Sequence, residues 1–309
     1  MSNEMKDINL DMVRVTEAAA IAASAWVGSG DKKGADKAAT DAMRHRLNSI
    51  EFCGKVVIGE GIKDESAGLF SGESVGMMCD VANSSLYDIA VDPIEGTRPT
   101  AISGPEALSV LAVAGKGCLY STPEFYMNKM AYGPYIYRRT KLSITDPLPI
   151  TIERIAKAID KEVSKVLVCV LDRPRHEDLI KQLRHLGVRI KLIQDCDVSA
   201  AIATCMGESG IDLLIGVGGS PEGVITACAI KCLRGDFQAQ LLKKDHILDP
   251  KVLTVDDLVK GPCAFAATGI TNGSLLRGVR YSREGAITNS VFMRSISGTV
   301  RWLTSLHGN

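Results

Sequence analysis

Residues 166–197 read VLVCVLDRPRHEDLIKQLRHLGVRIKLIQDCD, in which two short apolar runs flank an amphipathic segment. The pattern predicts a strand over 166–171, a helix over 177–186 and a strand over 188–193. Strands that alternate with helices in this way are typical of a parallel sheet whose faces the helices cover. We therefore expect α/β architecture in this part of the chain.

The prediction extends in both directions from this stretch. The alternation continues with a helix, a strand and a helix over 198–206, 212–217 and 223–232. Earlier segments predict helices over 13–26, 35–50 and 150–159, and strands over 55–59, 86–91 and 107–114. Residues 263–306 return to β-rich segments. We expect an α+β or α/β protein, with an N-terminal lobe 1–164 and a C-terminal lobe 165–309.

The composition is typical of a compact, folded protein. Of 309 residues, 46% are apolar and 23% are charged, and 36 basic residues balance 36 acidic ones. The chain lacks the excess of Lys and Arg that nucleic-acid and membrane-surface binders carry, so we expect neither partner. No apolar run approaches the ~20 residues of a membrane-spanning helix, and the polar N-terminus lacks a secretory signal, so we expect a cytoplasmic protein.

The nine cysteines include no Cys-x-x-Cys pair of the zinc or thioredoxin kind. Most stand inside apolar runs, where a thiol behaves as a small buried hydrophobe. We therefore expect reduced, structural thiols, and leave open the role of Cys196, which lies between two aspartates.

Residues 92–97, Asp-Pro-Ile-Glu-Gly-Thr, follow an expected strand and place Asp92 and Glu95 three positions apart. Pro93 fixes φ and removes a donor, so both carboxylates can turn to one side of a rigid bend. Two anions this close repel unless a cation lies between them, and Mg²⁺ or Mn²⁺ prefers such oxygen ligands and leaves positions for a phosphate. The glycine lets the backbone approach a phosphate oxygen, and the threonine offers a hydroxyl. An ordinary surface turn is the alternative.

This hexapeptide resembles the Asp-Pro-Ile/Leu-Asp-Gly-Ser/Thr motif of the metal-dependent, lithium-sensitive phosphatase superfamily, with Glu95 in place of the second aspartate. Other stretches look, in order, like class II fructose-1,6-bisphosphatase: Arg14-Val15-Thr16-Glu17, Gly30-Asp31-Lys32, Ala35-Asp36, Val57-Ile58-Gly59-Glu60-Gly61 and Gly218-Gly219-Ser220-Pro221-Glu222-Gly223. The resemblance covers nearly the whole chain. It implies a layered sugar-phosphatase fold of two lobes with the site between them, and a homo-oligomer, either a dimer or a tetramer.

By the same resemblance, metal-binding carboxylates come from four separate stretches: Asp36, Glu60, Asp92, Glu95 and Glu222. The expected strands agree, because Glu60 and Asp92 stand where strands end, and open α/β sheets form their sites at strand ends. Taken alone, Asp36 is as much a charge at a helix N-terminus as a metal ligand.

An acidic metal pocket cannot hold a second phosphate, so a bisphosphate requires basic groups elsewhere. Residues 173–175, Arg-Pro-Arg, follow a strand and precede a helix, where guanidinium groups and helix amides could face an anion. Residues 195–197, Asp-Cys-Asp, could accept hydrogen bonds from sugar hydroxyls. The alternatives are a solvated helix start and a helix cap. The resemblance implies that these residues contact substrate: Glu95, Gly96, Thr97, Tyr126, Arg173, Pro174, Arg175, Asp195, Cys196, Asp197 and Gly219.

One departure from the family concerns residue 196, where the family usually has glycine. We expect Cys196 to resist the positive φ that a glycine adopts there, so the loop or its sugar preference would differ.

The expected reaction is attack of water on the 1-phosphate of fructose 1,6-bisphosphate, a gluconeogenic step that gives fructose 6-phosphate and inorganic phosphate. Metal ions would polarise the phosphoryl oxygens, and Thr97 would orient or help deprotonate the water with Asp36 or Glu60 as acidic partner. The alternative substrates are sedoheptulose 1,7-bisphosphate, alone or as a second activity, and an inositol or nucleotide monophosphate. A more remote alternative is a nucleotide-binding regulatory protein built on the glycine-rich turn 216–223, although Pro221 replaces the third glycine of that motif.

Overall fold

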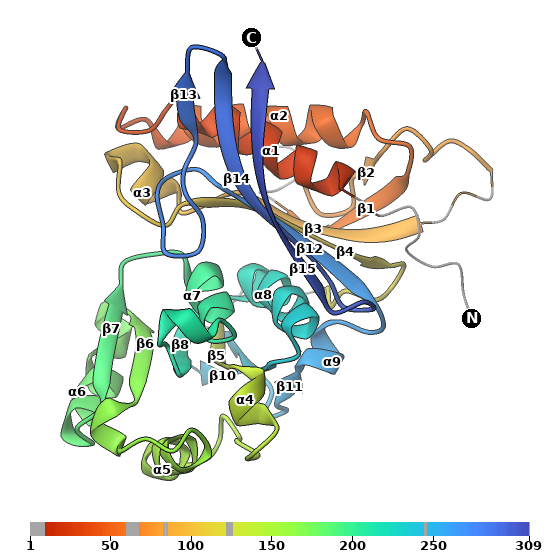
Figure 1. The fold of residues 1–309 in the computed structure, drawn as a ribbon. Coiled ribbons are helices and arrows are strands. Elements are labelled where there is room, and N and C mark those ends of the chain that lie inside the picture. The colour runs from red at the N-terminus through yellow and green to blue at the C-terminus, as the bar shows by residue number, and fades with distance from the viewer. Residues whose placement is uncertain are drawn as a thin grey trace. The chain divides into compact units, whose positions relative to one another are not determined.

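The computed structural model describes residues 10–59, 68–82, 84, 86–121, 126–243 and 246–308 (Figure 1). The chain forms two compact units: unit 1 comprises Met1–Ser121 and Val259–Asn309, and unit 2 comprises Thr122–Leu258. The boundary expected near Ser164 falls inside unit 2, between α5 (Leu148–Ala158) and β6 (Leu167–Leu171). Side chains from both of these elements belong to one hydrophobic core, so the change of pattern there marks the start of regular alternation within a unit.

Unit 1 is built on a mixed sheet with the strand order β13-β14-β12-β4-β3-β1-β2, and β15 pairs with β14. The strands are β1 (Cys53–Ile58), β2 (Ser74–Val75), β3 (Leu86–Glu95), β4 (Leu108–Gly115), β12 (Cys263–Gly269), β13 (Arg280–Ser282), β14 (Gly285–Arg294) and β15 (Thr299–Gly308). β1 and β3 run parallel, whereas β3–β4, β4–β12 and β12–β14 are antiparallel pairs. The β-rich C-terminal segment therefore completes the sheet that the first strands begin.

Two helices, α1 (Asp11–Ser24) and α2 (Lys32–Leu47), pack against this sheet and against each other (Figure 1). Small side chains allow their close approach, since Ala19, Ala23 and Ala39 are fully buried. The carboxylate of Asp31 caps α2 by accepting the backbone N–H of Gly34 at 2.9 Å. Two helices thus precede the first strand, as the sequence predicts.

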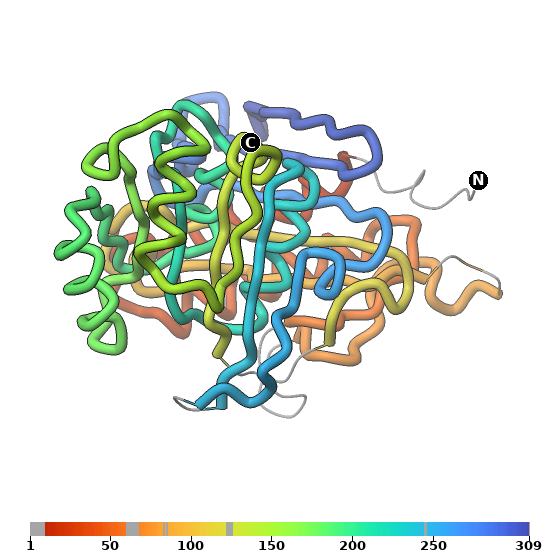
Figure 2. Tube along the Cα trace, turned by 90° about the horizontal axis from the view of Figure 1, so that it is seen from below, coloured from red at the N-terminus to blue at the C-terminus, as the bar shows by residue number. Residues whose placement is uncertain are grey.

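Unit 2 contains a second sheet with the strand order β10-β9-β5-β8-β6-β7, and β11 pairs with β9. Besides β6, its strands are β5 (Tyr126–Tyr132), β7 (Arg189–Ile193), β8 (Leu213–Gly219), β9 (Asp236–Lys243), β10 (His246–Ile247) and β11 (Leu253–Thr254). The parallel arrangement predicted for β6, β7 and β8 is confirmed. The sequence did not predict β5 and β9, which run antiparallel and lie side by side (Figure 2).

Helices cover both faces of the unit 2 sheet. α5 and α6 (Glu177–His185) bury Ile152, Ile155 and Leu183 in the core on one face. α7 (Asp197–Ala203) and α8 (Ser220–Leu233) pack on the other face (Figure 1). Because β6, β7 and β8 are parallel, their carboxyl ends lie at one edge of the sheet, which we call the carboxyl edge of unit 2.

A disulfide joins Cys53, the first residue of β1, to Cys79 in the segment after β2. The expectation of reduced thiols is wrong for this pair, whereas seven other cysteines are free. The two partners lie 26 positions apart in no recognisable spacing motif, and only the folding of unit 1 brings them together.

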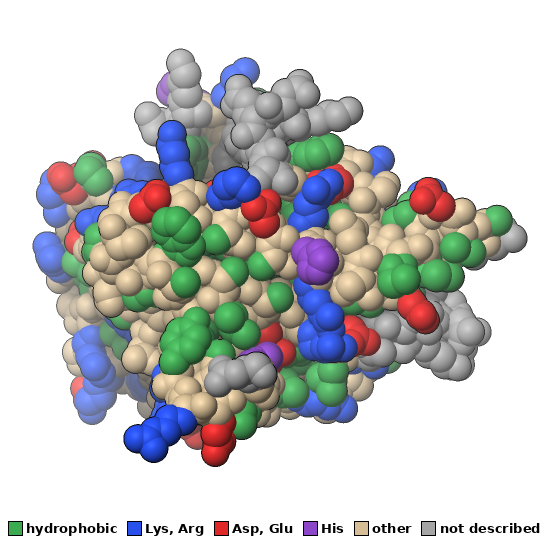
Figure 3. Space-filling model, turned by 90° about the horizontal axis from the view of Figure 1, so that it is seen from above, with side chains coloured by type: hydrophobic (Ala, Val, Ile, Leu, Met, Phe, Trp, Pro, Cys, Tyr) green, Lys and Arg blue, Asp and Glu red, His purple; other side chains and the backbone are tan. Residues whose placement is uncertain are grey.

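Charges of both signs are interspersed over the face that Figure 3 shows, in keeping with the 36 basic and 36 acidic residues of the chain. Among the helices that the structure describes, none combines the length and the apolar character that a bilayer crossing requires.

Candidate active site

The predicted motif lies at the end of β3, but the strand does not stop at Asp92. β3 continues to Glu95, and its register with β4 shifts between these two residues: Asp92 pairs with Val110 and Glu95 pairs with Leu108. β3 therefore advances three residues where β4 advances two, which is a β-bulge. In a regular strand, residues three apart point to opposite faces, and the extra residue of a bulge reverses that relation. The bulge, rather than a bend after the strand, turns both carboxylates to one side.

The two carboxylates are close together and buried. Asp92 is 9% exposed and Glu95 is 6% exposed, and an oxygen of each lies within 4.8 Å of an oxygen of the other. The backbone N–H of Ile94 donates to Oδ1 of Asp92 at 2.9 Å, which fixes one carboxylate. Two anions at this distance in a buried place repel unless a proton or a cation compensates them, and a hard divalent ion suits their oxygens.

A short helix, α3 (Thr97–Ile102), starts directly after the pair. Gly96 makes the turn into it with a φ of 100°, a left-handed value that favours glycine. The hydroxyl of Thr97 is half-buried and donates to the carbonyl of Ile94 at 3.3 Å. Thr100 Oγ1 donates to the carbonyl of Gly96 at 2.9 Å and anchors the turn. The backbone therefore holds the Thr97 hydroxyl within one turn of Glu95.

Asp36 and Glu60 are the other predicted acids of unit 1. Asp36 lies on α2, which packs against β3 and α3, and burial raises the pKa of its carboxyl. Glu60 lies outside the described residues. It follows β1, whose parallel pairing with β3 confirms that the two strands end at the same edge. Among the described residues, Asp36 is not one of the carboxylates that lie close enough together to share one ion.

The predicted substrate residues of unit 2 gather at its carboxyl edge. Arg173 precedes η2 (Pro174–His176), the 3-10 turn that follows β6, and forms an ion pair with Asp195, which follows β7. Tyr126 begins β5 and pairs with Gly219 at the end of β8. Four neighbouring strands thus deliver residues that the sequence analysis selected separately.

Arg175 is held at the same edge by two kinds of contact. Its Nε and Nη2 donate to the carbonyl of Val217 at 3.0 and 2.8 Å, and its guanidinium lies 5.2 Å from the centroid of the Tyr126 ring. This exposed guanidinium is therefore oriented by the backbone of β8. Glu222 lies in the first turn of α8, directly after β8.

His176 joins two of these strands through its ring. Its Nε2 accepts the backbone N–H of Val217 at 2.7 Å, so the proton resides on Nδ1, which donates to the carbonyl of Leu171 at 2.7 Å. The ring is 2% exposed, and desolvation lowers its pKa below the ordinary value of 6.5. His176 is therefore a neutral structural residue.

The lowered pKa of His176 predicts a dependence of stability on pH. The unfolded chain binds this proton at a pKa near 6.5 and the folded chain does so only at lower pH, so the free energy of unfolding falls as pH drops below about 6.5. Urea unfolding between pH 5 and 7.5 should show a smaller decline for His176→Gln than for the wild type. His185→Gln, at an exposed position of α6, is the control and should keep the wild-type slope.

Cys196 adopts a φ of 67° immediately before α7. The expectation that it would resist a positive φ is wrong, because the loop keeps the conformation that a glycine would take and accepts the strain. For an L-residue this strain is about 1–2 kcal/mol.

The strain at position 196 can be isolated with two substitutions that both remove the thiol. Cys196→Gly should be more stable than Cys196→Ala by about 1 kcal/mol in urea unfolding. Ala201, inside α7, is the control, because there glycine in place of alanine should lower the free energy of unfolding by about 1 kcal/mol. Equal stability of the two variants at position 196 would contradict the strain.

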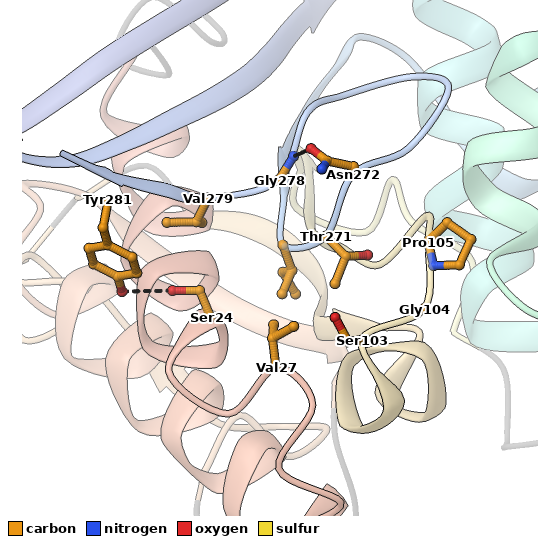
Figure 4. A pocket seen from close by; sticks show the side chains of 11 residues that line it. Ser24, Val27, Ser103, Gly104, Pro105, Thr271, Asn272, Gly278, Val279 and Tyr281 are labelled. Carbon is orange, nitrogen blue, oxygen red and sulfur yellow. Dashed lines mark hydrogen bonds between the residues drawn. The ribbon is translucent and has the colours of Figure 1, made fainter.

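Unit 1 also contains a cavity of about 400 Å³ at the C-terminal end of α3 (Figure 4). Ser24 and Tyr281 are joined there by a hydrogen bond of 2.8 Å, and Ser103, Thr271 and Asn272 add further polar groups. Among the described residues that line it there is no charged side chain and none of the predicted site residues. It therefore lacks the charges that a phosphate group requires.

Comparisons with known proteins identify the family of this chain. Residues 6–307 match the model of a family described as bacterial fructose-1,6-bisphosphatase, glpX-encoded. The chain is 41% identical over 332 residues to the D-fructose 1,6-bisphosphatase class 2/sedoheptulose 1,7-bisphosphatase of Synechococcus sp. (strain JA-3-3Ab), covering 97% of this chain and 95% of that protein. It is 40% identical over 334 residues to the protein of the same name from Thermosynechococcus vestitus, with the same coverage of 97% and 95%.

Proposed function

The chain belongs to the family of glpX-encoded bacterial fructose-1,6-bisphosphatases, and from this premise we propose that its reaction is built on Asp92 and Glu95. The chain is a phosphatase that hydrolyses fructose 1,6-bisphosphate to fructose 6-phosphate and inorganic phosphate. The observation that carries the proposal is the buried carboxylate pair that the bulge turns to one side of β3.

The proposed metal ligands are Asp92 and Glu95, whose oxygens lie within 4.8 Å of each other, together with Glu222. Glu222 belongs to unit 2, so the proposal requires this unit to bring it to the pair in unit 1. Asp36 and Glu60 are the further proposed ligands. When bound, Mg²⁺ or Mn²⁺ polarises the phosphoryl oxygens and lowers the pKa of a water molecule.

In the proposal, the carboxyl edge of unit 2 binds the rest of the substrate. Arg175 and Arg173 supply the positive charge for the second phosphate, and Tyr126 supports the Arg175 guanidinium. Asp195 and Asp197 accept hydrogen bonds from sugar hydroxyls. Pro174, Cys196 and Gly219 shape the backbone around them, as Gly96 does in unit 1.

Thr97 is proposed to act on the attacking water. Its hydroxyl is held at the start of α3 and can orient the water or pass on its proton. A threonine hydroxyl is a poor base by itself, so Asp36 or Glu60 must take the proton. Burial raises the pKa of the Asp36 carboxyl above its ordinary value, which makes this carboxylate a better proton acceptor.

The second candidate substrate is sedoheptulose 1,7-bisphosphate. Both relatives carry a name that includes this activity, at 41% and 40% identity. Each of the two sugars carries a phosphate at both ends, so Arg173 and Arg175 would supply positive charge for the second phosphate of either one. The ratio of kcat/KM values for the two bisphosphates distinguishes one activity from two.

The cellular setting is proposed to be gluconeogenesis in the cytoplasm, with Mn²⁺ or Mg²⁺ as cofactor and a dimer or tetramer as the working form. One feature supports assembly: β15 pairs with β14 along one edge and exposes Trp302 and Leu306. Light scattering of the purified chain measures the subunit number directly.

The test of the proposed function is release of inorganic phosphate from fructose 1,6-bisphosphate. Activity should require Mn²⁺ or Mg²⁺ and should stop when a chelator is added and return when the ion is restored. Turnover that persists in the chelator would overturn the metal site, and a folded protein with no turnover on either bisphosphate would overturn the reaction.

A further inference from the structure

A lysine is buried in the middle of unit 2. Lys129 stands at the centre of β5, 1% exposed, between β8 and β9. Its Nζ donates to Oδ2 of Asp197 at 2.9 Å, and the two side chains are 2% and 10% exposed. Burial of a charged lysine is costly unless a partner compensates it, and here the described partner is a carboxylate at the carboxyl edge.

The backbone of β8 is shaped to let this pair meet. A Cβ on Gly218 would lie 2.3 Å from Oδ2 of Asp197 and 2.8 Å from Nζ of Lys129, so any side chain at this position would displace the pair. Gly218 directly precedes Gly219, where β8 ends opposite Tyr126. The ion pair therefore lies against the strand ends that carry the proposed substrate contacts.

A second lysine–aspartate pair in unit 2 gives the comparison. Nζ of Lys161 lies 2.7 and 3.0 Å from the two oxygens of Asp212, which also accepts the backbone N–H of Leu167. Asp212 precedes β8 and Leu167 begins β6, so this pair lies at the amino ends of the strands, opposite the carboxyl edge. Unit 2 thus contains the same chemistry at both edges, and only the Lys129–Asp197 pair is withdrawn from solvent.

We infer that Lys129 is a positioning residue for sugar recognition, which it serves through Asp197. A buried ion pair adds little net stability, so its consequence is a fixed charge in a fixed place. Lys129 holds Oδ2 of Asp197 at 2.9 Å, so that Oδ1 is presented to a sugar hydroxyl as an acceptor. This inference rests on the proposed function, which makes Asp197 a substrate contact.

The test compares Lys129→Met with Lys161→Met. Methionine keeps the unbranched stem of the lysine side chain and removes its terminal ammonium group, and with it the charge. For Lys129→Met, KM for fructose 1,6-bisphosphate should rise about 10- to 100-fold, the loss expected for one hydrogen bond to a charged group, while kcat changes less than about threefold. Lys161→Met should lower the melting temperature and leave KM at the wild-type value.

A double variant separates positioning from packing. Lys129→Met with Asp197→Asn removes both buried charges, so it should fold with a melting temperature near that of the wild type, yet keep the raised KM. Recovery of the wild-type KM in this double variant would overturn the inference. A wild-type KM in Lys129→Met with a lowered melting temperature would also overturn it, since Lys129 would then be merely structural. If Lys129→Met does not fold, the double variant carries the test.

Binding of fructose 6-phosphate, measured by calorimetry without metal, tests the inference without turnover. Affinity should fall by the same factor in Lys129→Met and stay unchanged in Lys161→Met. If the wild type turns over the bisphosphate and all variants bind fructose 6-phosphate with equal affinity, the role of Lys129 is overturned and the proposed function is not. A wild type that neither turns over the bisphosphate nor binds fructose 6-phosphate would overturn the proposed function together with the inference.

Discussion

Glu95→Gln is expected to lower kcat for fructose 1,6-bisphosphate by about 10³-fold or more, since a bound divalent ion contributes several kcal/mol of transition-state stabilisation. The substitution keeps the shape of the side chain at the end of β3 but replaces a carboxylate oxygen with an amide. It therefore removes one of the two buried negative charges that the bulge brings together. Steady-state phosphate release at saturating Mn²⁺ measures kcat, and calorimetric titration with Mn²⁺ measures the accompanying loss of metal affinity.

Asp88→Asn provides the matched control on the same strand. Asp88 is 5% exposed and accepts the backbone N–H of Leu119 at 3.0 Å, a bond that asparagine can retain. This variant should keep kcat within a few-fold of the wild type. If Glu95→Gln lost no more activity than Asp88→Asn, the carboxylate pair would not be the metal site.

Thr97→Ala should lower kcat by about 10²–10⁴-fold, the range for a group that assists proton transfer to or from a reacting water. Thr97→Ser retains a hydroxyl at the first residue of α3 and should remain within about tenfold of the wild type. Thr97→Val keeps the branched shape without the hydroxyl and should lose as much as the alanine variant. Single-turnover phosphate release separates this chemical step from product release.

The pattern across the three substitutions decides the role of Thr97. A loss in valine and alanine but not in serine assigns the effect to the hydroxyl. Equal activity of alanine and serine would remove Thr97 from the mechanism.

The part of the fold that the sequence predicts best is the alternation from β6 to α8. Its strands are short and rich in Val, Ile and Leu. Its helices are amphipathic, as α6 is, or buried over most of their residues, as α7 and α8 are, so local pattern and tertiary packing agree. β5 escaped prediction because Lys129 interrupts its apolar character at a position that is fully buried. β9 escaped for a similar reason: Gln238 is buried and bonded to the carbonyl of Leu142, which lies far away in sequence. A polar residue whose partner is distant looks, locally, like a surface residue.

The candidate site divides in the same way. The Asp92 and Glu95 pair was predicted, because a proline between closely spaced carboxylates after an apolar strand is a local signal. The β-bulge that turns both carboxylates to one side was not predicted, because it depends on the register between β3 and β4. The Cys53–Cys79 disulfide and the Lys129–Asp197 pair join positions that no spacing rule connects.

The insertion of unit 2 between the two parts of unit 1 sets an order of events during synthesis. Ala114 of β4 pairs with Cys263 of β12, so that edge of β4 has no partner until residues beyond unit 2 leave the ribosome. Unit 2 is complete in sequence by Leu258 and can fold while its host sheet is unfinished. The nascent chain therefore carries an open, apolar strand edge for the time needed to translate unit 2, and an edge of this kind is a site of mispairing with other chains.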